Sequence, residues 1–376
     1  AAGTDARRFK RRSTQKHSFT QNVAFVCQSQ RRRSLKTVCE RQVIIVVIKV
    51  HNCAPFSYDL FPQIAINIKW KFDYLTNTRR NPSLIINDLK YWYDQAEMLL
   101  KFQEENWIND TGPISKFDQI NNIEAYNFMW PKSLSNKSKF ISSKKIAQLR
   151  IDQIYKLSKK EFNIDPFSEK LILDSGCGPG RYVKIMSNYN PKKIIGLDSG
   201  NEIINENIKN IKEKNITFVN GNSATLPFKD EEFDFVLSAG VLHHVNMPIE
   251  KTVPEHSRVL KEGGLFFIFI AGKSGIELDV WDFCHKLLSD VPIKLVHNRF
   301  SHSINHLRLQ GIMDHGFSSY FHTDRSDFEK LLKNNFKEII RVPGVPGIDV
   351  TEELFQDDKY FNLRFGSGNL RYICRK

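Results

Sequence analysis

The segment LILDSGCGPGRYV, residues 171–183, places an acid at the end of an apolar run and follows it with three closely spaced glycines. Asp174 ends the run, and glycines stand at positions 176, 178 and 180. Glycine lets the main chain turn tightly and lets a ligand approach the backbone. At the carboxyl end of a strand in an open parallel sheet, this arrangement predicts a ligand site. By itself the turn fits a purely structural role equally well, so the neighbouring motifs must distinguish a ligand site from a structural turn.

The spacing excludes two common nucleotide motifs. A dinucleotide turn has the pattern G-x-G-x-x-G, but Arg181 stands where its last glycine would be. A phosphate loop needs G-K-[ST], which does not follow. Further along, KIIGLD (193–198) ends in Asp198, whose carboxylate suits the two vicinal hydroxyls of a ribose. Asn222 follows a third strand-like run and offers a polar side chain to an adenine edge.

A sheet is needed to bring these residues together. Strand-like and helix-like runs alternate over 171–272, which predicts an α/β fold with a parallel sheet and helices on both faces. Amphipathic helices are expected at 84–103 and 143–160, and a capping box from Ser326 to Glu329 predicts a helix to about Asn334. Pro254 should kink or end the helix in which it falls. The expected strands are 170–174, 193–198, 216–220, 233–238, 264–270, 336–342 and 369–375.

Five motifs in a fixed order resemble those of one enzyme family. D-x-G-C-G-x-G at 174–180 precedes L-P-F at 226–228, F-D-x-V at 233–236, L-H-H at 242–244 and R-V-L-K-x-G-G at 258–264. The set resembles the class I S-adenosylmethionine-dependent methyltransferases, in particular those with a methyltransferase type 11-like domain. The resemblance covers about 145–272 closely. It implies S-adenosylmethionine as the cofactor and a Rossmann-like, mostly parallel sheet of seven strands with a C-terminal antiparallel hairpin.

The resemblance also implies a set of cofactor-binding residues, which lie in the glycine turn and at the ends of the following strands: Asp174, Gly176, Cys177, Gly178, Gly180, Asp198, Ser199, Asn222, Ser223 and Ala239. Asp174 and the turn would line the methionine side, and Asp198 with Ser199 the ribose. Asn222 and Ser223 would flank the adenine. The family usually has Asp at position 222, so Asn222 keeps an acceptor but loses a charge.

The catalytic demands of such an enzyme are modest. The sulfonium methyl group is already activated, so the protein mainly aligns the acceptor and excludes water. A general base is needed only when the acceptor is protonated and weakly acidic. His243 and His244, at the end of the fourth strand, and His315 are the catalytic candidates, although packing or capping of the loop is the simpler role for the first two. Asp314, Tyr320 and His322 are further base candidates.

Metal binding is not predicted. His302 and His306 have the helical i, i+4 spacing that a metal site can use, but the sequence positions no third ligand. The six cysteines form no C-x-x-C pair, which argues against a zinc knuckle and favours a reducing, cytoplasmic setting. The longest apolar run, 43–48, is far shorter than the roughly 18 residues of a membrane span.

The composition divides the chain into five parts. Residues 1–65 are basic and expected to be disordered, 66–144 form a helical and irregular segment, 145–272 form the cofactor-binding core, 273–322 a helical insert, and 323–376 the last helix and two closing strands. The segments 66–144 and 273–322 are expected to cover the acceptor. For 1–65 three interpretations stay open: a polyanion-binding tail, a transit-like peptide, or a stretch foreign to the native folded protein.

The charge distribution separates the candidate functions. Of the net charge of +13, the first 42 residues supply most, with eleven basic and two acidic side chains, so the body is nearly neutral. The leading hypothesis is therefore methyl transfer to an O, N or C atom of a small-molecule, lipid or glycan-type acceptor. A tRNA-type RNA methyltransferase that uses the basic arm is the first alternative. A methyltransferase-like binding module without catalysis is the second.

Overall fold

The structure is a computed structural model of the 376-residue chain, and it describes residues 98, 126, 128, 137–275, 277–278, 281–282, 285, 288, 293–301, 306–318, 320–358 and 361–376. The chain divides into two units, Ala1–Ile86 and Asn87–Lys376, and every described residue belongs to the second. The expected tail at 1–65 therefore lies outside the described residues. The same holds for the expected helix at 84–103, except for the helical Met98.

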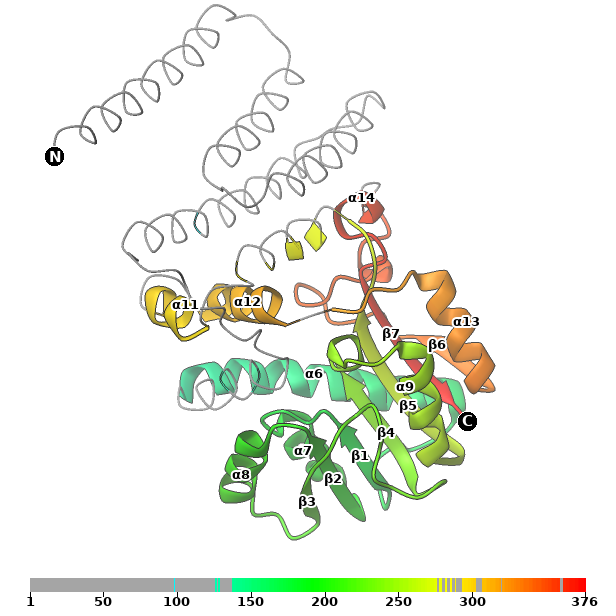
Figure 1. Cartoon of the computed structure of the whole chain (residues 1–376). Helices are drawn as coiled ribbons and strands as arrows, with labels where there is room; N and C mark the ends of the chain where they lie inside the picture. Colours follow the sequence, from blue (N-terminus) through cyan, green and yellow to red (C-terminus); the bar gives the residue numbers. More distant parts are fainter. Residues whose placement is uncertain are drawn as a thin grey trace, which may run out of the picture. The chain divides into compact units, whose positions relative to one another are not determined.

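The described residues build one seven-stranded sheet in the order β3-β2-β1-β4-β5-β7-β6 (Figure 1). The first five strands are parallel, and β7 pairs antiparallel with both β5 and β6. This confirms the predicted α/β fold with its closing antiparallel pair. The strands are β1 (Leu171–Ser175), β2 (Lys193–Asp198), β3 (Ile216–Asn220), β4 (Phe233–Ala239), β5 (Leu260–Ala271), β6 (Glu338–Arg341) and β7 (Asn369–Arg375).

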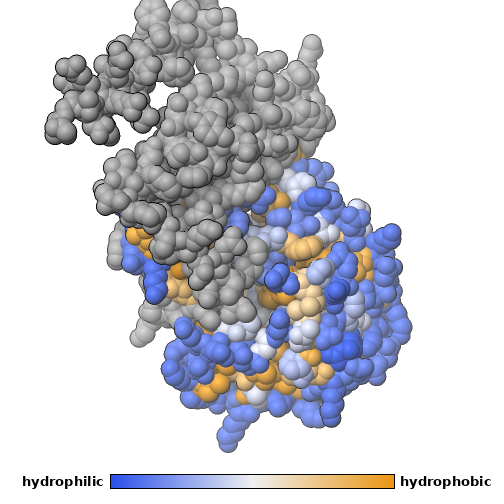
Figure 2. All heavy atoms as spheres, in the orientation of Figure 1, coloured by the Kyte–Doolittle hydropathy of each residue, from blue (hydrophilic) through white to orange (hydrophobic). Residues whose placement is uncertain are grey.

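Helices cover both faces of the sheet because successive strand residues point to opposite sides. On β1, Ile172 packs with α6 (Lys137–Phe162), α7 (Arg181–Met186) and α8 (Asn201–Asn210), whereas Leu173 packs with α9 (Ile249–Val259) and α13 (Arg325–Asn335). The two apolar clusters hold the sheet between them. The surface over α13 is mostly hydrophilic, as expected of an outward helix face (Figure 2).

The strand order places a switch point between β1 and β4. The chain runs outward from β1 through β2 to β3, then returns to β4 on the other side of β1. Ligands of open α/β sheets bind beyond the carboxyl ends of the strands at such a point. The glycine turn after β1, the end of β2 and the residues after β4 all lie at this edge.

The connection from β3 to β4 contains no helix. Residues 221–232 cross the sheet as coil, and Leu226 and Phe228 pack on the α9 face. Side chains of α9 satisfy the backbone of this coil: Glu255 accepts from the Leu226 N–H, and Arg258 donates to the Leu226 and Phe228 carbonyls. Arg258 also pairs with Glu255 and Asp230. Alternating strand and helix thus holds for the other crossovers but not for this one.

Several sequence-based element boundaries need correction. The capping box is wrong: α13 begins at Arg325 with Asp324 as its N-cap residue, and Glu329 instead accepts from the Tyr372 hydroxyl at 2.8 Å. Pro254 does not end α9, which continues to Val259. The helix α6 begins six residues before the expected 143, and β5 begins four residues before the expected 264. Edge strand β6 is shorter than expected.

The two ends of the insert at 273–322 lie side by side at the carboxyl end of β5. Gly272 forms a bridge with Thr323, and the Lys273 N–H donates to the Thr323 carbonyl at 2.9 Å. Between these ends lie α11 (Ile293–Phe300) and α12 (His306–Phe317). Both ends are thereby fixed at the carboxyl end of β5. Closer to the C-terminus, η3 (Glu352–Leu354) and α14 (Phe361–Phe365) precede β7.

Candidate active site

The glycine turn has a backbone that other residues would not adopt without strain. Gly176, Gly178 and Gly180 have φ angles of 83°, 48° and 69°, in the left-handed region that favours glycine. A Cβ at Gly176 would also clash with the side chain of Val241, which follows β4. The turn is therefore specified by its geometry, and its three glycines are required before any ligand is considered.

The end of β2 holds this turn in place. The Leu197 carbonyl accepts from the N–H groups of Gly176 and Cys177, both at 2.8 Å. One carboxylate oxygen of Asp198 accepts from the Gly178 N–H at 2.8 Å, and the other accepts from the Gly200 N–H at 3.0 Å. Burial raises the pKa of Asp198 above its usual range, although these backbone donors oppose the shift. The Ser199 N–H is a third backbone donor, and the carboxylate, which has about four lone-pair sites, keeps acceptor capacity for a ligand.

Asn207 of α8 completes the support of the turn. Its side-chain amide is buried and donates to the Gly178 carbonyl at 2.7 Å. Asn207 was not among the predicted site residues. Its spacing from Ile203 and Ile204, which places it on the apolar face of the helix, was the available signal.

Asp174 differs from Asp198 because part of its carboxylate lacks a partner. The side chain is 1% exposed, and its Oδ2 has no hydrogen-bond partner among the described residues. Burial raises the pKa of Asp174 to about 8, and repulsion from Asp198 adds to the shift while Arg181 opposes it. A buried carboxyl with an empty acceptor position is costly unless a ligand donor reaches it. Asp174 thus fits a ligand that brings an ammonium or hydroxyl group.

The other residues implied for the cofactor lie along the same edge. Ser199 is half-buried beside Asp198, and Ala239 ends β4 opposite Phe269 of β5. Ser223 is buried, whereas Asn222 is exposed. The Asn222 side-chain oxygen accepts from the Ala224 N–H at 2.8 Å, which uses one of its two lone pairs. The other lone pair and the amide nitrogen remain to offer an adenine.

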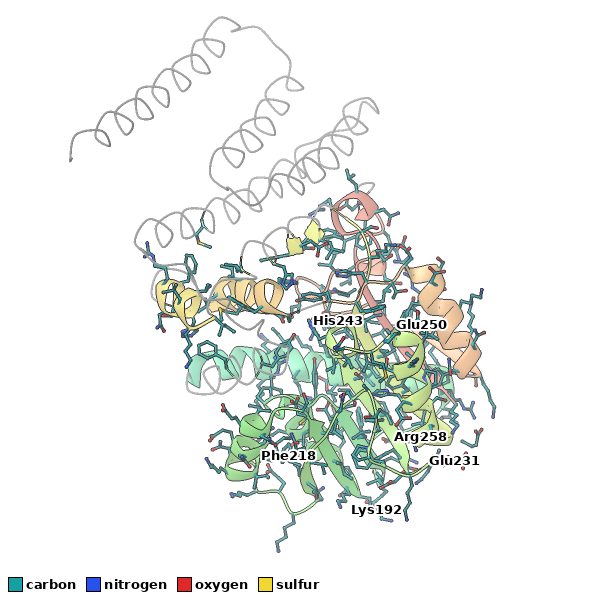
Figure 3. All side chains as sticks on the ribbon, in the orientation of Figure 1. Lys192, Phe218, Glu231, His243, Glu250 and Arg258 are labelled. Carbon is teal, nitrogen blue, oxygen red and sulfur yellow. The ribbon has the colours of Figure 1, made fainter. Side chains whose placement is uncertain are left out.

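A compact group of histidine and tyrosine rings lies at the carboxyl end of β4, where η2 (Leu242–His244) begins. In Figure 3, His243 lies at one end of the sheet, and Lys192 and Arg258 lie at the other end. His243 and His244 contact each other with ring centroids 4.1 Å apart, and Tyr320 lies 5.5 Å from the first and 4.4 Å from the second. Tyr320 also stacks on His315 at 5.1 Å and on His322 at 5.7 Å. We call these five residues the imidazole cluster.

The insert contributes three of the five members, and neighbouring residues complete the surroundings. Trp281 stacks on His315 at 4.4 Å, and the Tyr126 hydroxyl donates to Asp314 at 2.9 Å while its ring contacts His244. The Phe321 N–H donates to the His243 carbonyl at 2.6 Å, which joins the insert to η2. The structure therefore brings together all six base candidates of the sequence analysis. Tyr126 was missed because nothing in its local sequence marks it.

Burial lowers the pKa of three cluster histidines: that of His243 well below its usual range, that of His315 to about 4, and that of His322 below normal. Neighbouring imidazoles reinforce the shifts of His243 and His315, and Asp314 opposes that of His315. The Ala271 N–H donates to His243 Nδ1 at 3.4 Å, so the neutral ring carries its proton on Nε2. The Tyr320 hydroxyl and His322 Nδ1 are buried and have no hydrogen-bond partner among the described residues.

One buried arginine, Arg371, and two partly buried ones, Arg150 and Arg181, lie near the same edge on the α6 face. Asp349 pairs with both Arg150 and Arg371, and Arg181 lies close enough to Arg150 for mutual repulsion. Burial lowers the pKa of Arg371 to about 10, and its Nε and Nη2 have no partner among the described residues. The two guanidinium nitrogens of Arg371 that lack a partner among these residues could donate to an anionic group nearby.

The described residues contain neither a metal-binding cluster nor a membrane-spanning helix. No group of three or more His, Cys, Asp or Glu side chains there is arranged to hold a metal ion. Of the expected i, i+4 pair, His302 lies outside the described residues, and only the backbone of His306 is described. No helix within the described ranges is long and apolar enough to cross a membrane.

Comparison with known proteins agrees with this geometry. The family model described as a methyltransferase domain matches residues 173–268. The chain is 26% identical over 169 residues to the probable tRNA methyltransferase 9B of Mus musculus, covering 42% of this chain and 35% of that protein. It is 28% identical over 131 residues to the fatty-acid O-methyltransferase of Mycolicibacterium smegmatis, covering 35% and 46%. The chain thus spans less than half the length of either relative.

Among solved structures, the YcgJ protein of Bacillus subtilis aligns over 58% of this chain and 97% of its own, with a TM-score of 0.36 and 16% identity. The domain built around residues 173–268 is a methyltransferase domain. With its glycine turn, its strand order and its motifs, it is a class I domain, the class whose methyl donor is S-adenosylmethionine.

Proposed function

We propose that this chain transfers the methyl group of S-adenosylmethionine to an O, N or C atom of a small-molecule, lipid or glycan-type acceptor. One observation carries the proposal: the orphaned carboxyl of Asp174, the end of β2 and the imidazole cluster share one edge of the sheet. Donor-binding groups and acceptor-binding groups are thus adjacent, as a direct displacement requires.

The residues at the strand ends fit the functional groups of the cofactor. The carboxylate of Asp198 keeps acceptor capacity for a ribose hydroxyl, and the orphaned oxygen of Asp174 suits the ammonium group. The Nε and Nη2 of Arg371, which have no partner among the described residues, suit its carboxylate. When bound, S-adenosylmethionine supplies an activated methyl group. The implied roles of Ser199, Asn222, Ser223 and Ala239 are part of the same proposal.

The imidazole cluster is proposed as the acceptor site. His243 carries its proton on Nε2 and therefore orients the acceptor as a hydrogen-bond donor. His244 and His315 are the members that accept a proton where the acceptor has one to lose. Because burial keeps His315 neutral, it is in its basic form at neutral pH. The insert, with 66–144, is proposed to exclude water from the site.

A second candidate is an RNA acceptor. The similarity to the probable tRNA methyltransferase 9B supports it, and the basic residues of 1–42 would add phosphate contacts. The near-neutral charge of the remaining chain and the lowered pKa values of His243 and His315 favour the first candidate. A phosphate-rich acceptor would be better matched by exposed basic side chains around the site.

The experiment is a transfer assay with the full chain. We would incubate it with methyl-labelled S-adenosylmethionine, desalted cell extract and added metabolites, and then separate RNA, protein, lipid and small molecules. Label in the lipid or small-molecule fraction is expected. Nuclease-sensitive label would replace this acceptor class by RNA. Saturable cofactor binding without any transfer would instead support the non-catalytic binding module.

A further inference from the structure

His256 is a fully buried histidine that takes no part in the imidazole cluster. It lies on the apolar face of α9 between Val253 and Val259, with its ring stacked on Phe266 at 5.2 Å. Both ring nitrogens are engaged: Nδ1 lies 2.7 Å from the Thr252 carbonyl, and Nε2 lies 3.0 Å from the Ser175 hydroxyl oxygen. The hydrogen-bonded pair of His256 and Ser175 is buried among apolar residues, where an apolar side chain would also pack, so a role beyond packing is indicated.

The partners fix the direction of these hydrogen bonds. A carbonyl only accepts, so His256 Nδ1 carries the proton and donates to Thr252. Nε2 is then the acceptor, and the Ser175 hydroxyl must donate to it. Burial lowers the pKa of His256 to about 4, so this neutral tautomer holds at neutral pH. The hydroxyl of Ser175 therefore has one orientation, set by a helix that lies 81 residues further along the chain.

Ser175 links this bond to the cofactor-binding turn. It is the last residue of β1 and stands between Asp174 and Gly176. Side chains alternate along a strand, so Ser175 points to the α9 face while Asp174 points to the other. The hydrogen bond holds the Ser175 side chain, and it thereby restrains the backbone that carries Asp174 on one side and enters the left-handed turn at Gly176 on the other.

We propose that His256 is a positioning residue for cofactor binding, acting through Ser175 on Asp174 and the glycine turn. The role rests on the proposed function, since it presupposes that this turn binds S-adenosylmethionine. His256 touches neither the turn's binding surface nor the imidazole cluster in the described contacts. Its effect is expected on cofactor affinity rather than on the chemical step.

The test is a double-mutant cycle on cofactor affinity. We would measure the dissociation constant of S-adenosylmethionine by titration calorimetry for His256→Phe, Ser175→Ala and the double variant. Phe keeps the stack on Phe266 but leaves the Ser175 hydroxyl buried without an acceptor. His256→Phe should weaken binding about tenfold, and the double variant should bind more tightly than the two single effects predict. The KM for the cofactor should rise while kcat stays near the wild-type value.

A matched control separates positioning from stability. Val253→Ala removes buried apolar volume from the same helix without touching the hydrogen bonds, so it should lower the melting temperature but not cofactor affinity. If His256→Phe matches this control, with affinity unchanged, His256 has only a packing role and the proposal is wrong. Ser175→Ala gives a milder second variant. A folded wild type that binds no S-adenosylmethionine would instead overturn the proposed function itself.

Discussion

Asp174 and Asp198 end neighbouring strands, yet the protein satisfies their carboxyl groups differently. Each oxygen of Asp198 accepts from a backbone N–H, whereas one oxygen of Asp174 accepts from none of the described residues. Residues whose environment disfavours their charged form are often functional. In the proposed function, Asp198 both supports the turn and binds the ligand, whereas the free oxygen of Asp174 binds only the ligand.

Asp174→Asn should separate stability from binding. At neutral pH the cofactor-free fold bears the cost of a buried carboxyl whose pKa is raised to about 8, and the amide removes that cost. The free energy of unfolding at pH 8 should rise by at least about 1 kcal/mol, as measured by urea denaturation. Affinity for S-adenosylmethionine should fall at the same time. A variant that loses stability together with affinity would contradict this role for Asp174.

Tyr320→Phe should impair use of the acceptor without weakening cofactor binding. The buried hydroxyl has no hydrogen-bond partner among the described residues, so its removal should leave the free energy of unfolding unchanged or raise it. If the hydroxyl contacts the acceptor, kcat/KM for the acceptor should fall roughly tenfold or more, with cofactor affinity unchanged. Tyr372→Phe is the matched control, since that hydroxyl binds Glu329. It should lower stability and spare activity; equal kinetics in the two variants would argue against the cluster.

At the scale of elements, the coil that joins β3 to β4 depends on one arginine. Arg258 donates to two carbonyls of 221–232 and pairs with Glu255 and Asp230. Lys cannot reproduce this planar fork. Arg258→Lys should lower stability by about 1–3 kcal/mol. It should also weaken S-adenosylmethionine binding, because Asn222 and Ser223 belong to the same coil.

Arg375→Lys is the control for this variant. Arg375 makes one exposed pair with Glu338, and such pairs contribute little to stability. In thermal denaturation, Arg375→Lys should have the melting temperature of the wild type, whereas Arg258→Lys should have a clearly lower one. If both variants denature together with the wild type, the coil does not depend on the guanidinium fork.

Much of the fold could be predicted from the sequence, because apolar runs that end in Asp174 and Asp198 mark buried parallel strands directly. The coil at 221–232 could not, since its stability comes from Arg258 and Glu255, which lie outside it. Ser326 and Glu329 satisfy the capping pattern, but Tyr372 from a distant strand binds Glu329 instead. Local patterns fail where a tertiary partner takes over a local role.

The candidate site likewise has one part that could be predicted from the sequence and one part that could not. The glycine turn is local in sequence and has the geometry its spacing implies. The imidazole cluster joins η2 to 315–322 across more than 70 residues, and the sequence supplied its members without showing that they meet. Ser175 and His256 form a pair that no spacing rule identifies.

For the whole molecule, buried neutral histidines predict acid sensitivity. His256 has a folded-state pKa of about 4, below the usual 6.5, so its contribution to stability is complete above pH 6.5 and is lost as the pH falls toward 4. Glu255, which faces it electrostatically, opposes this shift only in part. Between pH 7 and 4.5 His256 alone should cost on the order of 2–3 kcal/mol.

Urea denaturation at both pH values checks this expectation. The fall in the free energy of unfolding from pH 7 to 4.5 should be smaller in His256→Phe than in the wild type, although the variant is less stable at pH 7. Asp174 has the opposite sign, since its raised pKa costs stability as the pH rises from about 4 to 8. An unchanged pH dependence in His256→Phe would show that its imidazole is not the group that titrates.

Cofactor binding at the carboxyl ends of β1 and β2 is the claim on which the rest depends. Titration calorimetry of S-adenosylmethionine into the full chain tests it, with Asp198→Asn as the site variant and the exposed Asp327→Asn as its control. Saturable binding of one molecule per chain is predicted, weakened roughly tenfold to a hundredfold by Asp198→Asn and unaltered by Asp327→Asn. Absence of binding by the folded wild type, or equal affinity in all three proteins, would contradict the account.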